Sequence, residues 1–112
     1  MNANILTYIG TSFGEIEDSI KDEFFIVAET LTLREVFFKT VEVEDGKPKA
    51  NLLSVYDYYD ADLEENIFMV VEMSIVKDSQ EFKFGEFLEP GGFDSLVEVE
   101  NFLNKTENVL KI

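Results

Sequence analysis

Apolar and polar positions alternate most regularly between residues 66 and 77. Every second residue of this segment is apolar, which is the period of a β-strand. The apolar residues of this face are Ile67, Met69, Val71, Met73 and Ile75. The residues between them are also mostly apolar, so the segment is predicted to be an interior strand of a sheet, buried on both faces.

The residues that follow predict an antiparallel hairpin. Asp78-Ser79-Gln80 offers a short turn, and within residues 81–88 Phe82 and Phe84 alternate with charged neighbours. This second strand is therefore expected to pair with the first.

A second hairpin is expected upstream. Residues 34–44 are predicted to form a strand and residues 50–58 its return. The turn is placed at residues 45–49, because Gly46 tolerates positive φ and Pro48 cannot continue a hydrogen-bonded ladder. The first strand is expected to place three residues on one face: Phe37, Val41 and Val43.

Two helices are predicted from capping boxes, in which a Ser hydroxyl accepts from a backbone N–H three residues later. Ser12 and Glu15 begin one helix over residues 13–22, and Ser95 and Glu98 begin another near the end of the chain. Both segments carry an apolar stripe at helical spacing, formed by Ile16 and Ile20 in the first and by Leu96, Val99 and Leu103 in the second.

Residues 24–33 are compatible with two structures. Their Thr and Val content favours a strand, whereas Thr32-x-x-Glu35 is the spacing that caps a short helix. The elements together predict an α+β fold, with a mostly antiparallel sheet of about five or six strands and an N-terminal and a C-terminal helix packed on one face. A chain of 112 residues is expected to form a single domain, residues 1–112.

The composition fits a folded chain with a strongly negative surface. Hydrophobic residues make up 46% of the sequence and include 11 Phe, unlike the aromatic-poor composition of a disordered acidic segment. Asp and Glu number 24 against 9 Lys and Arg, giving a formal net charge of -15. Because nucleic acids and anionic membranes are also negative, direct binding to either is not expected.

The residue types exclude several kinds of active site. Cys and His are both absent, so Ser-His-Asp and Cys-His systems, disulfides, and His- or Cys-ligated zinc sites cannot form. A pair of carboxylates can act as general acid and base on a glycoside, but such enzymes need a deep cleft that a small domain rarely provides. We therefore expect no enzyme activity and no cofactor.

A partial calcium-binding pattern occurs in the middle of the chain. Asp60, Asp62 and Glu64 place oxygen ligands at alternate positions, as the beginning of an EF-hand loop does. That loop continues with Gly at its sixth position and Glu at its twelfth, where this chain has Glu65 and Val71. The spacing is compatible with weak surface calcium binding, and no dedicated metal site is predicted.

Residues 56–65 concentrate aromatic and acidic side chains. They include three of the four Tyr and five carboxylates, and no Lys or Arg occurs between Lys49 and Lys77. Tyrosine is enriched where one protein anchors on another, and carboxylates steer and pair with Lys and Arg. The predicted partner-binding residues are Tyr56, Asp57, Tyr58, Tyr59, Asp60, Asp62, Glu64 and Glu65.

Other interpretations of this stretch remain open. The tyrosines are compatible with ordinary sheet positions, and the acids with a solvated connection between strands. In an extended segment Asp60, Asp62 and Glu64 would follow one another at about 6.6 Å, a spacing similar to two nucleotide rises along a phosphate backbone. Arg34, the only arginine, is expected to make a structural ion pair.

In its size, charge, lack of Cys and His, and cluster of Tyr, Asp and Glu, the chain resembles small acidic bacterial inhibitors, particularly the immunity proteins that neutralise nuclease toxins in contact-dependent inhibition and colicin-type systems. The resemblance implies a non-catalytic protein, monomeric when free, that binds a basic nuclease toxin domain and blocks its active site or nucleic-acid groove. It also implies a cytoplasmic location, which the absence of a signal-peptide pattern in the N-terminal residues favours.

Two other functions are compatible with the sequence. A phage-encoded nucleic-acid mimic, such as an anti-CRISPR or anti-restriction protein, would use its charge pattern in place of DNA and lose affinity gradually as carboxylates are removed. An adaptor subunit would bind through an apolar sheet face and keep its partner at high salt. An inhibitor of one toxin is instead expected to depend on a few anchor residues.

We expect the melting temperature to rise when NaCl is added at moderate concentration. Exposed like charges repel one another in the folded domain, and salt screens this repulsion over roughly 8–10 Å. Thermal unfolding followed by circular dichroism in a NaCl series measures the effect. A flat or falling dependence would mean that the acids are paired or dispersed.

Overall fold

Five strands form one antiparallel sheet in the computed structural model of the protein, which describes residues 3–112. They are β1 (Thr32–Glu44), β2 (Lys47–Asp60), β3 (Glu65–Val76), β4 (Phe82–Phe87) and β5 (Leu110–Lys111). Their order across the sheet is β4-β3-β2-β1-β5, and each neighbouring pair is antiparallel. The predicted α+β class is confirmed, as are both hairpins and the interior position of the strand over residues 66–77.

Helices α2 (Phe13–Glu23) and α3 (Leu96–Thr106) begin where the capping boxes predict. The backbone N–H of Glu15 donates to Ser12 Oγ over 3.2 Å, and that of Glu98 donates to Ser95 Oγ over 3.3 Å. The sequence pattern does not reveal α1 (Ala3–Ile9), because seven residues are too few to establish a helical period. Within residues 3–112, no helix is long and apolar enough to span a membrane.

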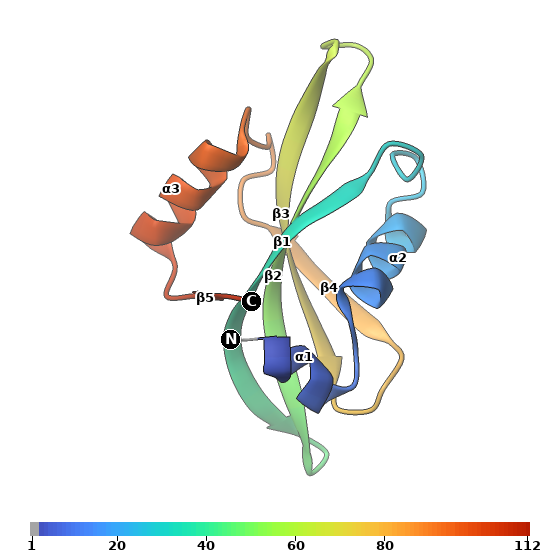
Figure 1. Ribbon diagram of the computed structural model, residues 1–112, viewed down its shortest axis with the longest axis vertical. Helices are drawn as coiled ribbons and strands as arrows, with labels where there is room; N and C mark the ends of the chain where they lie inside the picture. Colours follow the sequence, from blue (N-terminus) through green and yellow to red (C-terminus); the bar gives the residue numbers. More distant parts are fainter. Residues whose placement is uncertain (1–2) are drawn as a thin grey trace.

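The helices cover both faces of the sheet. Figure 1 shows the sheet nearly edge-on, with α3 on one side and α1 and α2 on the other. The expectation that the helices share one face was therefore wrong. Because β2 and β3 carry apolar side chains on both faces, each face needs its own cover to keep those side chains from water.

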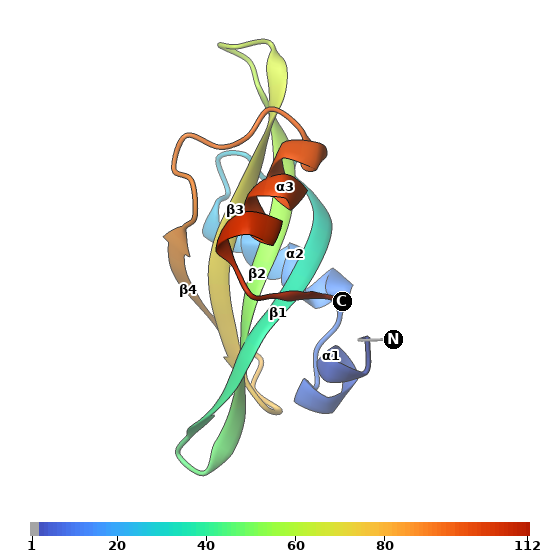
Figure 2. The same cartoon turned by 90° about the vertical axis from the view of Figure 1, so that its left-hand side faces the viewer.

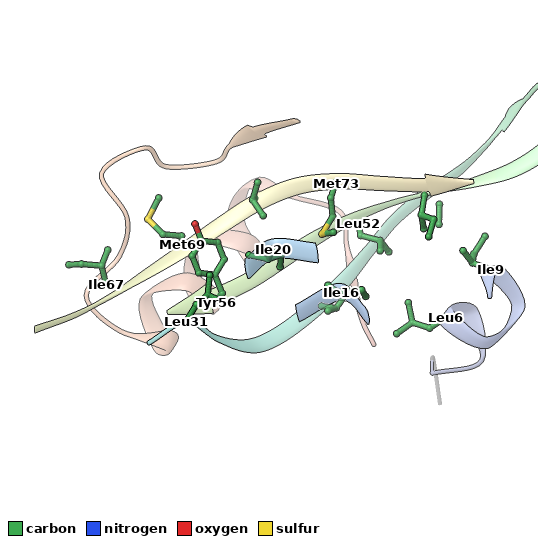
Figure 3. Close-up of a cluster of buried hydrophobic side chains, with 14 residues drawn as sticks. Leu6, Ile9, Ile16, Ile20, Leu31, Leu52, Tyr56, Ile67, Met69 and Met73 are labelled. Atoms are coloured by element: carbon green, nitrogen blue, oxygen red, sulfur yellow. The ribbon is translucent and has the colours of Figure 1, made fainter. Parts of the chain in front are cut away.

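The larger core lies between the sheet and the two N-terminal helices. Figure 3 shows side chains of α1 and α2 facing those of β2 and β3. All five residues of the predicted alternating face of β3 belong to this core, as expected. Its buried residues are Leu6, Ile9, Ile16, Ile20, Leu31, Val36, Ala50, Leu52, Tyr56, Ile67, Met69, Val71, Met73 and Ile75.

A smaller core lies under α3 on the opposite face. Val99 and Leu103, both from the predicted apolar stripe of this helix, are buried against residues of three strands. The buried strand residues of this core are Phe37, Leu53, Val55 and Val70. Adjacent residues of β2 and β3 thus alternate between the two cores, as the period of a strand requires.

The turn between β1 and β2 is tighter than the predicted turn over residues 45–49. Asp45 and Gly46 form it alone, with φ angles of 51° and 80°. Positive φ at both central residues is the geometry of a two-residue hairpin whose twist matches that of the strands. Pro48 lies inside β2 opposite Val43, close to the start of the strand.

The expectation that Phe37, Val41 and Val43 share a face was wrong. A bulge after Phe38 interrupts the pairing of β1 with β2. Phe37 therefore belongs to the core under α3, whereas Val41 lies opposite Ala50, a residue of the other core. One inserted residue reverses the side-chain alternation of everything beyond it.

Residues 24–31 form successive turns rather than a strand or a regular helix. Backbone N–H groups donate to carbonyls three residues earlier, from Val27 to Phe24 over 3.0 Å and from Leu31 to Ala28 over 3.3 Å. These turns carry the chain from α2 to the start of β1 at Thr32. Of the predicted range 24–33, residues 24–31 therefore form turns and residues 32–33 belong to β1.

The twisted sheet is longer than the helices that cover it (Figure 2). The molecule measures 46 Å along its longest axis and 30 and 23 Å across. The β1–β2 and β2–β3 hairpins project at opposite ends of this long axis (Figure 1). Both hairpin ends are therefore free of the helical cover.

Gly92→Ala is expected to lower the free energy of unfolding by about 2–4 kcal/mol. Gly92 has a φ of 79°, and a Cβ there would lie 2.6 Å from Ile67 Cγ2 and 2.9 Å from Met69 Sδ. Gly91→Ala is the matched control, because a Cβ at Gly91 meets nothing within 4 Å. Urea unfolding measures both variants, and equal stability would contradict the steric explanation.

Candidate functional site

The stretch predicted to bind a partner spans the end of β2, the following turn and the start of β3. The two strands remain paired as far as Asp60, which lies opposite Glu65, and residues 61–64 form the turn. Figure 1 shows this hairpin end at the top, beyond α2 and α3. The eight predicted residues lie close together along this hairpin, but they differ in exposure.

Tyr56 and Asp57 are buried. Tyr56 is 2% exposed, and its ring stacks on that of Phe24 with centroids 5.9 Å apart. Burial raises the pKa of the Tyr56 hydroxyl, which therefore stays protonated. Asp57 is 1% exposed. The burial of Asp57 is not compatible with the direct partner contact expected from the sequence, and Tyr56 is accessible only where it lines an apolar groove with Phe24 and Phe87.

The buried carboxylate of Asp57 is neutralised by Arg34, whose side chain is 43% exposed. Arg34 Nε donates to Asp57 Oδ1 over 2.6 Å and its Nη2 donates to Oδ2 over 3.2 Å, while Asn66 Nδ2 donates to Oδ2 over 2.7 Å. The hydrogen bond to Asp57 raises the pKa of the Arg34 guanidinium. The bidentate ion pair with Arg34 and the hydrogen bond from Asn66 connect β1, β2 and β3 at the base of the hairpin. The expected structural ion pair of Arg34 is therefore confirmed.

The other predicted residues are at least partly exposed. Tyr58 is half-buried against the larger core, and Tyr59, on the opposite face of β2, is 46% exposed. Thr30 Oγ1 accepts a hydrogen bond from the backbone N–H of Tyr59 over 3.0 Å, which ties residues 24–31 to the hairpin. The exposed or half-exposed set is Tyr58, Tyr59, Asp60, Asp62, Glu64 and Glu65.

The acidic residues follow a tight turn. Asp60 Oδ1 accepts from the backbone N–H groups of Asp62 (2.9 Å) and Leu63 (3.0 Å), and Glu64 has a φ of 54°. The row of charges about 6.6 Å apart that an extended segment would produce is therefore absent from this hairpin. Among the described residues, no three acidic side chains are arranged to hold a metal ion.

Four carboxylates at this hairpin end have no ion-pair partner among residues 3–112: Asp60, Asp62, Glu64 and Glu65. Asp60 and Glu65 also lie directly opposite each other in the ladder. Like charges at directly opposed positions destabilise an antiparallel pair. The negative charge of this end is thus uncompensated within the described part of the chain.

The opposite end of the molecule provides a contrast. There Lys49 pairs with Glu42 and with Glu44, each at 3.5 Å, and Lys83 pairs with Glu44 at 3.6 Å. Glu42 and Glu44 of the β1–β2 hairpin are therefore neutralised by lysines of β2 and β4. The two hairpin ends differ in charge compensation although both are acidic in sequence.

An apolar groove of about 340 Å³ lies beside the β2–β3 hairpin, on the face that α2 covers. It is lined by residues 23–27, by Tyr56 and Tyr58 of β2, by Met69 of β3 and by Phe87 of β4. Tyr58 and Asp60 lie two residues apart on one face of β2, a separation of about 6.6 Å. The groove and the acidic hairpin end are therefore neighbours.

A second polar cluster lies at the other edge of the sheet. Glu35 of β1 is 7% exposed and pairs with Lys111 of β5, which also pairs with Glu100 of α3 at 3.4 Å. Burial raises the pKa of Glu35, in spite of the neighbouring lysine. These ion pairs connect β5 to β1 and α3. The role of the cluster is therefore structural.

The sequence pattern does not identify Phe25 and Ile26 as surface residues. They are 76% and 85% exposed although both are large and apolar. A signal was present, because residues 24–28 are five consecutive apolar residues bounded by acids at Glu23 and Glu29, and neither an alternation nor a helical stripe accounts for the run. Their exposure adds apolar surface beside the predicted acidic residues.

Comparisons with protein-family models, with curated protein sequences and with solved structures find no match to this chain. A function for the protein has therefore to be inferred from its own geometry and charge.

Arg34→Gln is expected to lower the free energy of unfolding by about 2–3 kcal/mol, because the buried carboxylate of Asp57 loses two of its hydrogen bonds. Adding Asp57→Asn should recover part of this loss, since a neutral amide needs no counter-charge. Lys21→Gln is the control: it removes a partly exposed ion pair with Glu17 at 3.6 Å, in which neither side chain is buried as Asp57 is, and should cost less than about 0.5 kcal/mol. Urea unfolding measures all variants, and equal effects of the two single substitutions would contradict this role of Arg34.

Proposed function

We propose that the protein is a non-catalytic acidic inhibitor that binds a basic nuclease toxin domain through its β2–β3 hairpin, in the manner of an immunity protein. The observation that carries this proposal is the group of unpaired carboxylates at the hairpin end. A turn needed only as a connection would be more stable with a Lys or Arg among these acids. The uncompensated charge is useful where the counter-charges belong to another molecule.

The form of the hairpin fits a positively charged groove. A nuclease must attract phosphates, so the surface around its active site is positive. The hairpin extends past the helices (Figure 2), and Tyr59 and Leu63 are exposed beside its carboxylates. Entering the groove of a nuclease, the carboxylates would accept hydrogen bonds from the Lys and Arg side chains that otherwise hold phosphates.

The net charge supports rapid capture of such a partner. A charge of -15 attracts a basic domain over a distance of about one Debye length, which steers the two surfaces together before they touch. An inhibitor that works in the cytoplasm has to reach the toxin before the toxin reaches nucleic acid. Fast association is therefore the property that such an inhibitor needs.

Two other functions have less support from the geometry. A nucleic-acid mimic is expected to arrange charges along a line as phosphates are, whereas Asp60, Asp62 and Glu64 gather around a turn. An adaptor that binds through an open apolar sheet face would need that face free, whereas helices pack on the apolar residues of both faces.

Affinity capture from bacterial lysate, supplemented with the product of the neighbouring reading frame, tests the partner directly. Capture is carried out in parallel at about 0.1 and 0.5 M NaCl, where the Debye length falls from about 10 Å to less than half that value, and partners are identified by mass spectrometry. One basic nuclease domain retained at the higher salt supports the proposal. A CRISPR or restriction complex, or many DNA-binding proteins that wash off with salt, would favour the mimic instead.

Asp62→Lys combined with Glu64→Lys is expected to slow association with the captured nuclease at least roughly tenfold, because it reverses charge at the contact. Asp18→Lys combined with Glu81→Lys is the matched control, since it changes the net charge equally at exposed acids away from the hairpin. Stopped-flow fluorescence measures both. If the two double variants slow association equally, net charge alone matters and the hairpin is not the contact.

A further inference from the structure

Phe25 and Ile26 form the exposed apolar edge of the groove. The rest of the groove is held in place by packed aromatic rings. Phe24 stacks on Tyr56 at 5.9 Å and contacts the rings of Phe84 at 5.7 Å and Phe87 at 5.4 Å. The aromatic packing of Phe24 and the hydrogen-bonded turns after it hold this segment in place. The groove therefore exists before any ligand arrives, while its two most exposed residues have no such packing.

The groove is large enough to accommodate one large apolar side chain. Its volume of about 340 Å³ lies at the lower end of the range of roughly 300–1,000 Å³ found for ligand pockets. Its surface is formed mainly by aromatic and aliphatic side chains, and Glu23 is the one charged residue among the described residues that line it. A groove of this kind recognises an apolar group by removing it from water.

The negative charge around the groove favours a positively charged occupant. The apolar run of residues 24–28 is bounded by Asp22 and Glu23 on one side and by Glu29 on the other, and Asp60 lies two residues beyond Tyr58 on the same strand. A second copy of this chain would bring another charge of -15 to the same surface, which opposes self-association. Charge complementarity therefore points to an apolar side chain carried by a basic segment.

We propose that this groove is the anchor site for one large apolar side chain on a Lys- and Arg-rich segment of a partner protein. The proposal rests on the proposed inhibitory function for the identity of that protein, but the groove and its charge stand on their own geometry. The acidic hairpin end steers the basic segment, and the groove holds its apolar residue. Binding energy in protein interfaces is concentrated in such desolvated pockets, with charged residues at the rim.

The test uses two synthetic peptides as probes, acetyl-Lys-Lys-Phe-Lys-Lys-amide and the same peptide with Ala in place of Phe. Each is titrated into the ¹⁵N-labelled protein, and amide shifts are followed by NMR. The Phe peptide is expected to bind at least roughly fivefold more tightly than the Ala peptide, because only its ring is removed from water. It should shift the amides of Phe25, Ile26, Tyr58 and Phe87, whereas the Ala peptide should affect mainly residues 60–65.

Phe25→Ser combined with Ile26→Ser should abolish the difference between the two peptides. Both residues are exposed, so the fold should be retained, and the NMR spectrum reports this directly. Val43→Ser is the matched control, because Val43 is an apolar residue 76% exposed at the opposite end of the molecule. The control variant should still prefer the Phe peptide as strongly as the unmodified protein does.

Equal affinity of the unmodified protein for both peptides, with shifts confined to residues 60–65, would overturn the anchor site and leave the acidic hairpin as the contact. Retention of the full preference by the Phe25→Ser and Ile26→Ser double variant would overturn it as well. The inhibitory function fails separately, if no nuclease domain is captured. If a captured nuclease binds the double variant with unchanged affinity, the anchor site is contradicted but the proposed inhibitory function is not.

Discussion

The structure depends on the apolar character of both faces of β2 and β3. These two strands pair over twelve positions from Lys49 opposite Val76 to Asp60 opposite Glu65, and along most of this length both faces must be removed from water. The N-terminal helices therefore pack on one face and α3 on the other. Since these helices are shorter than the strands, the ends of the long hairpins project from the molecule.

Both projecting ends are acidic, and they differ in how far lysines compensate their charge. At the β1–β2 end, lysines of β2 and β4 neutralise the glutamates. At the β2–β3 end, Arg34 neutralises the buried carboxylate of Asp57, and the carboxylates beyond it have no ion-pair partner among residues 3–112. The ion pair of Asp57 thus marks the boundary between a carboxylate that holds the hairpin together and carboxylates that have no ion-pair partner among residues 3–112.

In the proposed complex, the acidic hairpin end and the apolar groove would make different contributions to binding. Charge acts over several ångströms and raises the rate of association, but exposed ion pairs add little affinity. Apolar contact acts only at short range and slows dissociation. Tyr58, which lines the groove and lies two residues from Asp60, joins the two on one face of β2. A basic partner with an apolar side chain would use both.

The sequence by itself determined the features that depend on neighbouring residues: the capped starts of α2 and α3, the alternation of β3, the antiparallel hairpins, the α+β class and the excess of acid. Only the tertiary structure decided which residues of 56–65 are exposed. Asp57 is internal because Arg34 reaches it from 23 residues away, and Tyr56 is buried because Phe24 stacks on it. The placement of the helices on opposite faces and the bulge after Phe38 have the same cause. Burial is set by contacts between segments that are distant in sequence. The pattern of residues within one segment does not show which distant segment will cover it.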